Sequence, residues 1–253
     1  MENKFPVGFY SKKHLTIFLS GILASVGIDV LILILIVNNV LKNSIFVLLF
    51  LILIIIEFIV LTKYLTYPMD IVHYDFRKNM DYEKTKAKLE AMIAADTTYE
   101  TKNYVRVQLL RYATIYEKKY CELLIKDIYL PKVRNEVFLL DYYESLFNYY
   151  LVTGSHSKCK NILNALTEYK APKQFYNKLS VLYSLYMKYE VIESELVALN
   201  PVDKNPLNKQ ISLYGYALYY RNNNNIEKYE KYKALVNRIS ENNTYYTSLE
   251  MNK

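Results

Sequence analysis

Two apolar runs near the N-terminus constrain this chain most, because a helix of about 20 apolar residues is long enough to cross a bilayer. Residues 15–37 read LTIFLSGILASVGIDVLILILIV, and residues 45–61 read IFVLLFLILIIIEFIVL. Only Asn38–Ser44 connects the two runs. We therefore predict a two-helix transmembrane hairpin over residues 15–66, with spans at about 15–37 and 45–65.

A cleaved signal peptide is the alternative for the first run. Signal sequences have a short apolar core and a small-residue cleavage site. The run at 15–37 is longer, does not end in A-x-A, and is followed at once by the second run. These features favour a membrane anchor over a cleaved signal.

Flanking positive charges predict the orientation of the hairpin, because Lys and Arg accumulate on the cytoplasmic side. They lie before the first run and after the second: Lys4, Lys12, Lys13, Lys63, Arg77 and Lys78. The connecting loop has only Lys42. We therefore predict a multi-pass cell-membrane protein with both termini in the cytoplasm, including an N-terminal segment over 1–14.

The hairpin carries one carboxylic acid in each apolar run, Asp29 and Glu57. Counted from Leu41 back to Asp29 and from Ile45 on to Glu57, both lie about 12 residues deep, so we expect this polar pair at one depth. Gly21 and Ser25 share a helical face with Asp29, and small residues let helices pack closely. Three interpretations stay open. The carboxyls are neutral and hydrogen-bonded to each other or to Ser25, or they meet a polar helix of another subunit, or they form a proton or ion pathway.

Beyond the hairpin the sequence predicts an all-α fold. Residues 67–80 contain Pro68, which ends or kinks helices, and Asp70, which can cap the next turn, so we predict an elbow or interfacial segment there. From Asp81 to residue 241, apolar residues recur with a helical period, strand alternation is absent and Gly is scarce. Residues 242–253 are polar and are predicted to form a C-terminal tail.

The helix-period segments are separated by regular breaks. A helix begins at Asp81, and the following helices are predicted at about 99–117, 120–130, 135–152, 158–169, 174–188, 190–199, 207–221 and 226–240. Aromatic residues precede the inner turns at intervals of 34, 36 and 34 residues: Tyr116, Tyr150, Tyr186 and Tyr220. A two-helix unit repeating at about 34 residues is the signature of tetratricopeptide arrays.

One segment matches more than the spacing. It is Leu146-Phe147-x-x-Tyr150-x-x-x-Gly154-x-x-x-x-Cys159-x-x-x-Leu163-x-x-Leu166. It resembles the tetratricopeptide order of an aromatic residue, a turn glycine, a small residue and large apolar residues, with Cys159 where Ala is usual. Residues 213–235 give a second, poorer match. The resemblance covers about 99–240, implies a tetratricopeptide-like α-solenoid that binds a protein or peptide, and carries no catalytic residues.

The tyrosines are the candidate contact residues of that solenoid. There are 28 in the chain, and Tyr offers a large contact area with a polar tip. The simpler interpretation is that these rings fill helix–helix contacts. The residues that we predict to line a partner-binding groove are Tyr143, Tyr150, Tyr183, Tyr186, Tyr216 and Tyr220.

The sequence gives no sign of an active site. Its three histidines, His14, His73 and His156, are scattered, and it contains no metal-spaced cluster, phosphate-binding loop or nucleophile motif. The two cysteines, Cys121 and Cys159, have no CxxC spacing and are expected to be reduced and buried. We predict a non-enzyme without cofactor or metal. The net charge of +7 suits an anionic membrane surface or solubility better than nucleic acid, which we do not expect as a partner.

These features predict a membrane-anchored scaffold or adaptor, whose partners are the lipid bilayer and an unidentified protein or peptide. The alternative is an accessory subunit or oligomeric component of a transport or secretion system that uses Asp29 and Glu57, either in a membrane complex or as a homo-oligomer. A second alternative is an immunity or peptide-sensing membrane protein. The Lys-, Asn-, Ile- and Tyr-rich composition resembles that of AT-rich bacterial proteins.

Overall fold

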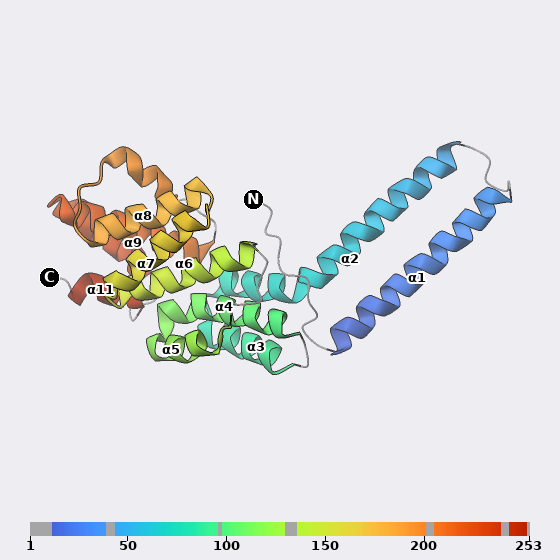
Figure 1. Ribbon diagram of the computed structural model, residues 1–253, viewed down its shortest axis with the longest axis horizontal. Coiled ribbons are helices and arrows are strands. Elements are labelled where there is room, and N and C mark those ends of the chain that lie inside the picture. Colours follow the sequence, from blue (N-terminus) through green and yellow to red (C-terminus); the bar gives the residue numbers. More distant parts are fainter. Residues whose placement is uncertain are drawn as a thin grey trace.

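A computed structural model describes residues 12–38, 44–95, 98–129, 136–200, 205–238 and 243–251, and every secondary-structure element in these ranges is a helix. The predicted all-α class is therefore confirmed over the described residues. A long hairpin of α1 and α2 projects from a body made of the remaining helices (Figure 1). In order, the elements are α1 (Lys12–Val37), α2 (Ser44–Asn79), α3 (Tyr82–Ala94), α4 (Tyr99–Tyr116), α5 (Lys118–Asp127), α6 (Glu136–Val152), α7 (His156–Glu168), α8 (Lys173–Tyr186), the 3₁₀ helix η1 (Glu193–Leu199), α9 (Pro206–Asn222), α10 (Ile226–Asn237) and α11 (Thr244–Met251).

The hairpin exposes the apolar side chains of both its helices. In α1, Leu15–Val37 is 23 residues long, enough by length and composition to cross a membrane as an anchor or to serve as a signal sequence. The apolar part of α2, Phe46–Leu61, is shorter. Leu23 and Phe58 are each at least 70% exposed, as side chains that face lipid would be.

Helix α2 continues through Pro68 to Asn79 instead of ending at the predicted elbow. Figure 1 shows the helix turning where it enters the body, as proline-containing helices commonly do. Residues 67–79 are therefore the last turns of α2, and Asp70 lies inside the helix rather than at a cap. The physical reason is tertiary packing, because Met69, Val72 and Phe76 in these turns are fully buried against the body.

Helix starts in the body follow the predicted local signals. Asp81 caps α3, with its carboxylate accepting a hydrogen bond from the Lys84 amide, and Asn225 caps α10 in the same way through the Lys228 amide. Gly154 has a φ of 72° in the turn between α6 and α7, which is the left-handed region that favours glycine. The segment predicted as a helix at 190–199 is instead the 3₁₀ helix η1.

The C-terminal segment predicted as a polar tail contains a packed helix, α11. Asn243 caps it by accepting a hydrogen bond from the Tyr246 amide at 2.7 Å. Tyr245 and Leu249 are buried, with 1% and 0% of their surface exposed. The prediction was wrong because α11 has only 8 residues and a largely polar sequence, so its stability comes from packing rather than from helical pattern.

Candidate functional site

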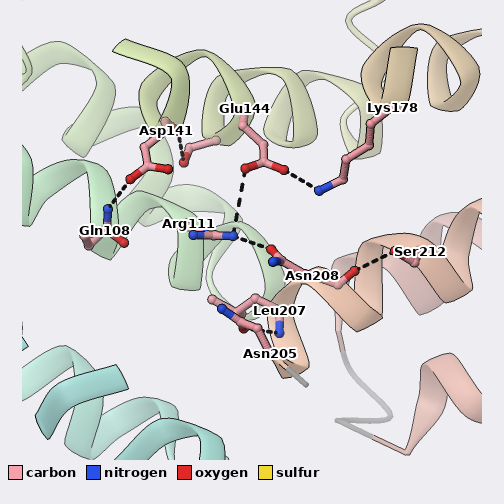
Figure 2. Close-up of polar contacts among 10 residues, drawn as sticks. Gln108, Arg111, Asp141, Glu144, Lys178, Asn205, Leu207, Asn208 and Ser212 are labelled. Carbon is pink, nitrogen blue, oxygen red and sulfur yellow. Dashed lines mark hydrogen bonds and ion pairs between the residues drawn. The ribbon is translucent and has the colours of Figure 1, made fainter. Parts of the chain in front are cut away.

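Helix α4 contacts more of the molecule than any simple two-helix unit requires. It packs on α3, α5 and α6, it meets the end of α2, and it touches α11. Its inward polar side chains join a cluster that we call the polar cluster, shown in Figure 2. The cluster consists of Gln108 and Arg111 on α4, Asp141 and Glu144 on α6, Lys178 on α8 and Asn208 on α9.

Glu144 is the centre of the polar cluster and is only 7% exposed. Its carboxylate accepts a hydrogen bond from Lys178 Nζ at 2.6 Å and lies 3.9 Å from Arg111 Nη2. Burial opposes the charged form, but Lys178 and Arg111 together outweigh burial and lower the pKa of Glu144 below its ordinary value. The side chain is therefore a buried carboxylate whose charge is balanced by two cations.

Asp141 lies one turn before Glu144 on α6 and behaves in the opposite way. Its carboxylate accepts a hydrogen bond from the Gln108 amide at 3.0 Å. Burial raises the pKa of Asp141, although the positive charge of Arg111 opposes that rise. The two carboxyls thus share the cation of Arg111, which mainly favours ionisation of Glu144.

Arg111 connects helices that are far apart in the sequence. Its guanidinium donates a hydrogen bond to the side-chain carbonyl of Asn208 on α9 as well as facing Glu144 on α6. Among the described residues its Nε is buried without a hydrogen-bond partner. Arg111 was not among the residues that the sequence predicted to form a site. The available signal was its position between apolar neighbours, since Leu109, Leu110 and Tyr112 are all buried.

The end of α2 reaches α4 next to Arg111. The His73 Nδ1 lies 2.5 Å from the Tyr112 hydroxyl, and the Phe76 ring lies 4.6 Å from the Tyr112 ring. Burial, with the positive charges of Arg111 and Arg77, lowers the pKa of His73 to about 3. The uncharged His73 side chain therefore connects α2, a helix of the apolar hairpin, to α4 in the body.

Helix α11 binds beside the polar cluster, on a surface formed by helices that come early and late in the sequence of the body. We call this the α11-binding surface and define it by Thr114 on α4, Tyr214 on α9, and Tyr229 and Lys233 on α10. The Tyr214 ring packs on the Tyr245 ring with centroids 5.1 Å apart. Burial raises the pKa of Tyr245 well above its ordinary value, and the charge of Glu144 adds to that rise.

The polar contacts of α11 are distributed along its length. The Thr244 hydroxyl donates to the Thr114 carbonyl, and the hydroxyls of Ser248 and Tyr214 lie 3.1 Å apart. At the far end, Lys233 Nζ lies 2.6 Å from the Glu250 carboxylate. The helix therefore presents an aromatic ring, a small hydroxyl, a leucine and an acid to the body.

The six tyrosines predicted to line a groove all pack against the core, and Tyr220 is buried while the other five are half-buried. Tyr216 and Tyr220 both stack on Tyr232, at 5.1 and 5.4 Å between ring centroids, so they join α9 to α10. Tyr186 lies 4.9 Å from the His156 ring at the start of α7. These contacts match the simpler interpretation of tyrosines as helix–helix packing. A role of Tyr143, Tyr150 or Tyr183 in partner binding stays a prediction.

The carboxyls of the hairpin do not lie at one depth. The Ser25 hydroxyl donates a hydrogen bond to Glu57, and a Cβ on Gly21 would lie 3.5 Å from Leu61, so this register places Ser25, not Asp29, opposite Glu57. Asp29 is one turn closer to the loop, about 6 Å along the axis. The predicted depth was wrong because α1 ends at Val37, four residues before Leu41, from which the depth of Asp29 was counted. Among the described residues, Asp29 Oδ1 is buried without a hydrogen-bond partner.

The cysteines are as expected. Both Cys121 and Cys159 are free and buried, and burial raises the pKa of each thiol to about 12, so neither is a reactive thiolate. Within the described part of the chain, no group of three or more His, Cys, Asp and Glu residues could hold a metal ion.

A comparison with protein families, curated proteins and solved structures finds no match to this chain. What the structure shows is a helical protein with an N-terminal apolar helix that is long enough to serve as a membrane anchor or a signal sequence. At the polar cluster and at the α11-binding surface, helices of the body that are distant in the sequence meet.

Proposed function

We propose that this chain is a membrane-anchored adaptor whose cytosolic helical body holds a protein or peptide partner at the bilayer. The observation that carries the proposal is the continuity of α2. Its apolar part, Phe46–Leu61, and its buried turns around Phe76 belong to one helix. A helix anchored in lipid is thus also part of the body's core, so the body is held at the membrane without a flexible linker.

The body is proposed to be a tetratricopeptide-like array. Helices α4 and α5, α6 and α7, α8 and η1, and α9 and α10 follow one another as contacting pairs. The pattern residues occupy suitable places, because the Cys159 thiol on α7 lies 3.8 Å from the Phe147 carbonyl on α6, a close approach that a small residue permits. The 3₁₀ helix in the third pair makes that repeat irregular. Arrays of this kind bind peptides and helices on the concave surface that their stacked repeats form.

The hairpin is proposed to cross the membrane twice, with both chain ends in the cytoplasm. The cations that flank the apolar segments support this topology. A cysteine introduced near Asn39 should react with an impermeant reagent on intact cells, while one near Asn224 should react only after permeabilisation. The reverse pattern would contradict the cytosolic placement of the body.

Site-specific photo-cross-linking tests partner binding directly. Tyr183 is a half-buried residue of the predicted groove, and Tyr169, at the end of α7, is 39% exposed and serves as a matched tyrosine control. A photoreactive phenylalanine analogue at Tyr183 should give one discrete cross-linked protein in living cells, and the same analogue at Tyr169 should not. Equal amounts of cross-linked protein at both positions, or none at Tyr183, would contradict a partner bound in the predicted groove.

A second function has support in the hairpin. A buried carboxyl oxygen without a donor, such as Asp29 Oδ1, is costly in an apolar environment. Because Ser25 is directed to Glu57, the missing donor for Asp29 would come from another membrane helix. This supports a hairpin that joins a membrane complex, such as a transport or secretion system, or a homo-oligomer.

A further inference from the structure

Helix α11 occupies a surface that adjacent helices of the body could not form alone. Its contacts come from α4 and α6 near the start of the body and from α9 and α10 at its end. In Figure 1 it lies close to the C-terminus, at the end of the body farthest from the hairpin. Helix α11 thus covers residues on four helices of the array that we propose to bind a partner.

The contacts of α11 define the chemistry of a helix that fits this surface. The buried Tyr245 ring packs on Tyr214, Ser248 follows three positions later at the Tyr214 hydroxyl, and the buried Leu249 follows at the fourth position. Glu250 then meets Lys233. The pattern is an aromatic residue, a small hydroxyl, a leucine and an acid on one side of a short helix.

The surface keeps partners for its charged groups when α11 is absent. Lys233 also lies 3.6 Å from Glu230 on its own helix, so loss of Glu250 leaves it with a carboxylate. Glu144 keeps Lys178 and Arg111, which belong to the body. A helix of 8 residues is too short to be stable alone in water, so α11 is helical because it is bound. These properties fit a bound helix whose Tyr245 and Leu249 side chains complete the core when α11 is in place.

We propose that the α11-binding surface is the docking site for a short helix of a protein partner with this pattern, and that α11 covers the surface until the partner displaces it. The inference rests on the adaptor function proposed above and specifies its partner. Because α11 is tethered, it competes for the surface at a high effective concentration. The affinity of a partner for the uncovered surface must therefore be higher than its apparent affinity for the protein with α11 bound.

The test uses the full chain, purified in mild detergent, with a protease site replacing residues 239–242. The probe is a fluorescent peptide of residues 243–253, measured by anisotropy before and after cleavage. Cleavage should increase the affinity for the peptide by about tenfold or more, because the tethered competitor becomes free to leave. Lys233→Glu should weaken binding of the peptide, and a Glu250→Lys peptide should restore it. No exchange after cleavage, with excess peptide, would overturn the proposal by showing that α11 is a permanent part of the core.

A cellular arm identifies the occupant. A photoreactive residue at Ile226, which is 63% exposed at the start of α10 and one turn before Tyr229, should cross-link a partner several-fold more when Tyr245→Ala weakens α11, and less when Lys233→Glu alters the surface. Cross-linking to a second copy of this chain instead would overturn the partner form of the proposal. Peptide exchange needs no partner, so its failure is distinct from a failure of membrane recruitment, which concerns the adaptor function itself.

Discussion

Removing residues 1–80 should unfold the helical body, whereas removing only residues 1–65 should not. The first fragment lacks the end of α2, with its buried side chains of Met69, Val72 and Phe76. Burying a side chain of this size contributes about 1.5–3 kcal/mol, so the three contribute on the order of 5–9 kcal/mol as an upper estimate. Domains are stable by only about 5–15 kcal/mol, so this loss is comparable to the whole free energy of unfolding.

Urea unfolding followed by circular dichroism measures this difference. The fragment 66–253 should be helical and unfold cooperatively, while 81–253 should unfold at much lower urea or lack a cooperative transition. In 66–253, Phe76→Ala should reduce the free energy of unfolding by about 3–5 kcal/mol. Tyr74→Ala is the matched control in the same turn, because Tyr74 is 57% exposed and its loss should cost less than about 0.5 kcal/mol. Equal stability of the two fragments would refute α2 as a core element of the body.

Four further predictions concern single side chains. Lys178→Met should lower the free energy of unfolding, measured in urea, by about 3 kcal/mol, because it leaves the buried Glu144 with the more distant Arg111 guanidinium as its main cation. Adding Glu144→Gln should recover part of that loss. The pKa of His73 is lower when folded, about 3, than its ordinary 6.5, so the unfolded chain binds the extra proton and stability falls as the pH drops below 6.5. Between that pH and about pH 5 the loss should reach about 2 kcal/mol, and His73→Gln should abolish this slope. Gly154→Ala should lower the free energy of unfolding by about 1–2 kcal/mol in the same assay, because the φ of Gly154 is 72°, and Gly154→Asn should lower it less. An equal loss in both variants would contradict a left-handed turn. Asp29→Leu should leave membrane insertion intact but reduce co-purification of a membrane partner or of the homo-oligomer, and unchanged assembly would mean that this carboxyl has no role in it.

Local signals were sufficient to predict most helices of the body. Asp81 satisfies backbone amides at the start of α3, and Gly154 supplies a left-handed turn that few other residues adopt, so each acts within a few residues of its own position. Pro68 shows the limit of such reasoning. Its local effect is to break a helix, but packing of the following turns against α3 and α4 keeps α2 continuous. That packing depends on residues distant in the sequence and cannot be read from the segment itself.

The candidate site was harder to predict than the fold, because its members come from separate helices. Arg111, Glu144 and Lys178 are separated by about 30 residues each, and nothing in their own neighbourhoods indicates that they meet. Helix α11 was missed since its sequence is short and polar, and only the surface that it covers explains Tyr245 and Leu249. The offset of Asp29 from Glu57 followed from the position where α1 ends, which the apolar run alone does not fix.

The most direct test of the adaptor account is where the cross-linked partner is found in the cell. The full chain and a chain lacking residues 1–61, each carrying the photoreactive residue at Tyr183, are compared by separating membrane and soluble fractions after irradiation. The account predicts that both chains cross-link the same protein, in the membrane fraction with the full chain and in the soluble fraction with the shortened one. A partner that stays in the membrane fraction with the shortened chain would contradict recruitment by the hairpin.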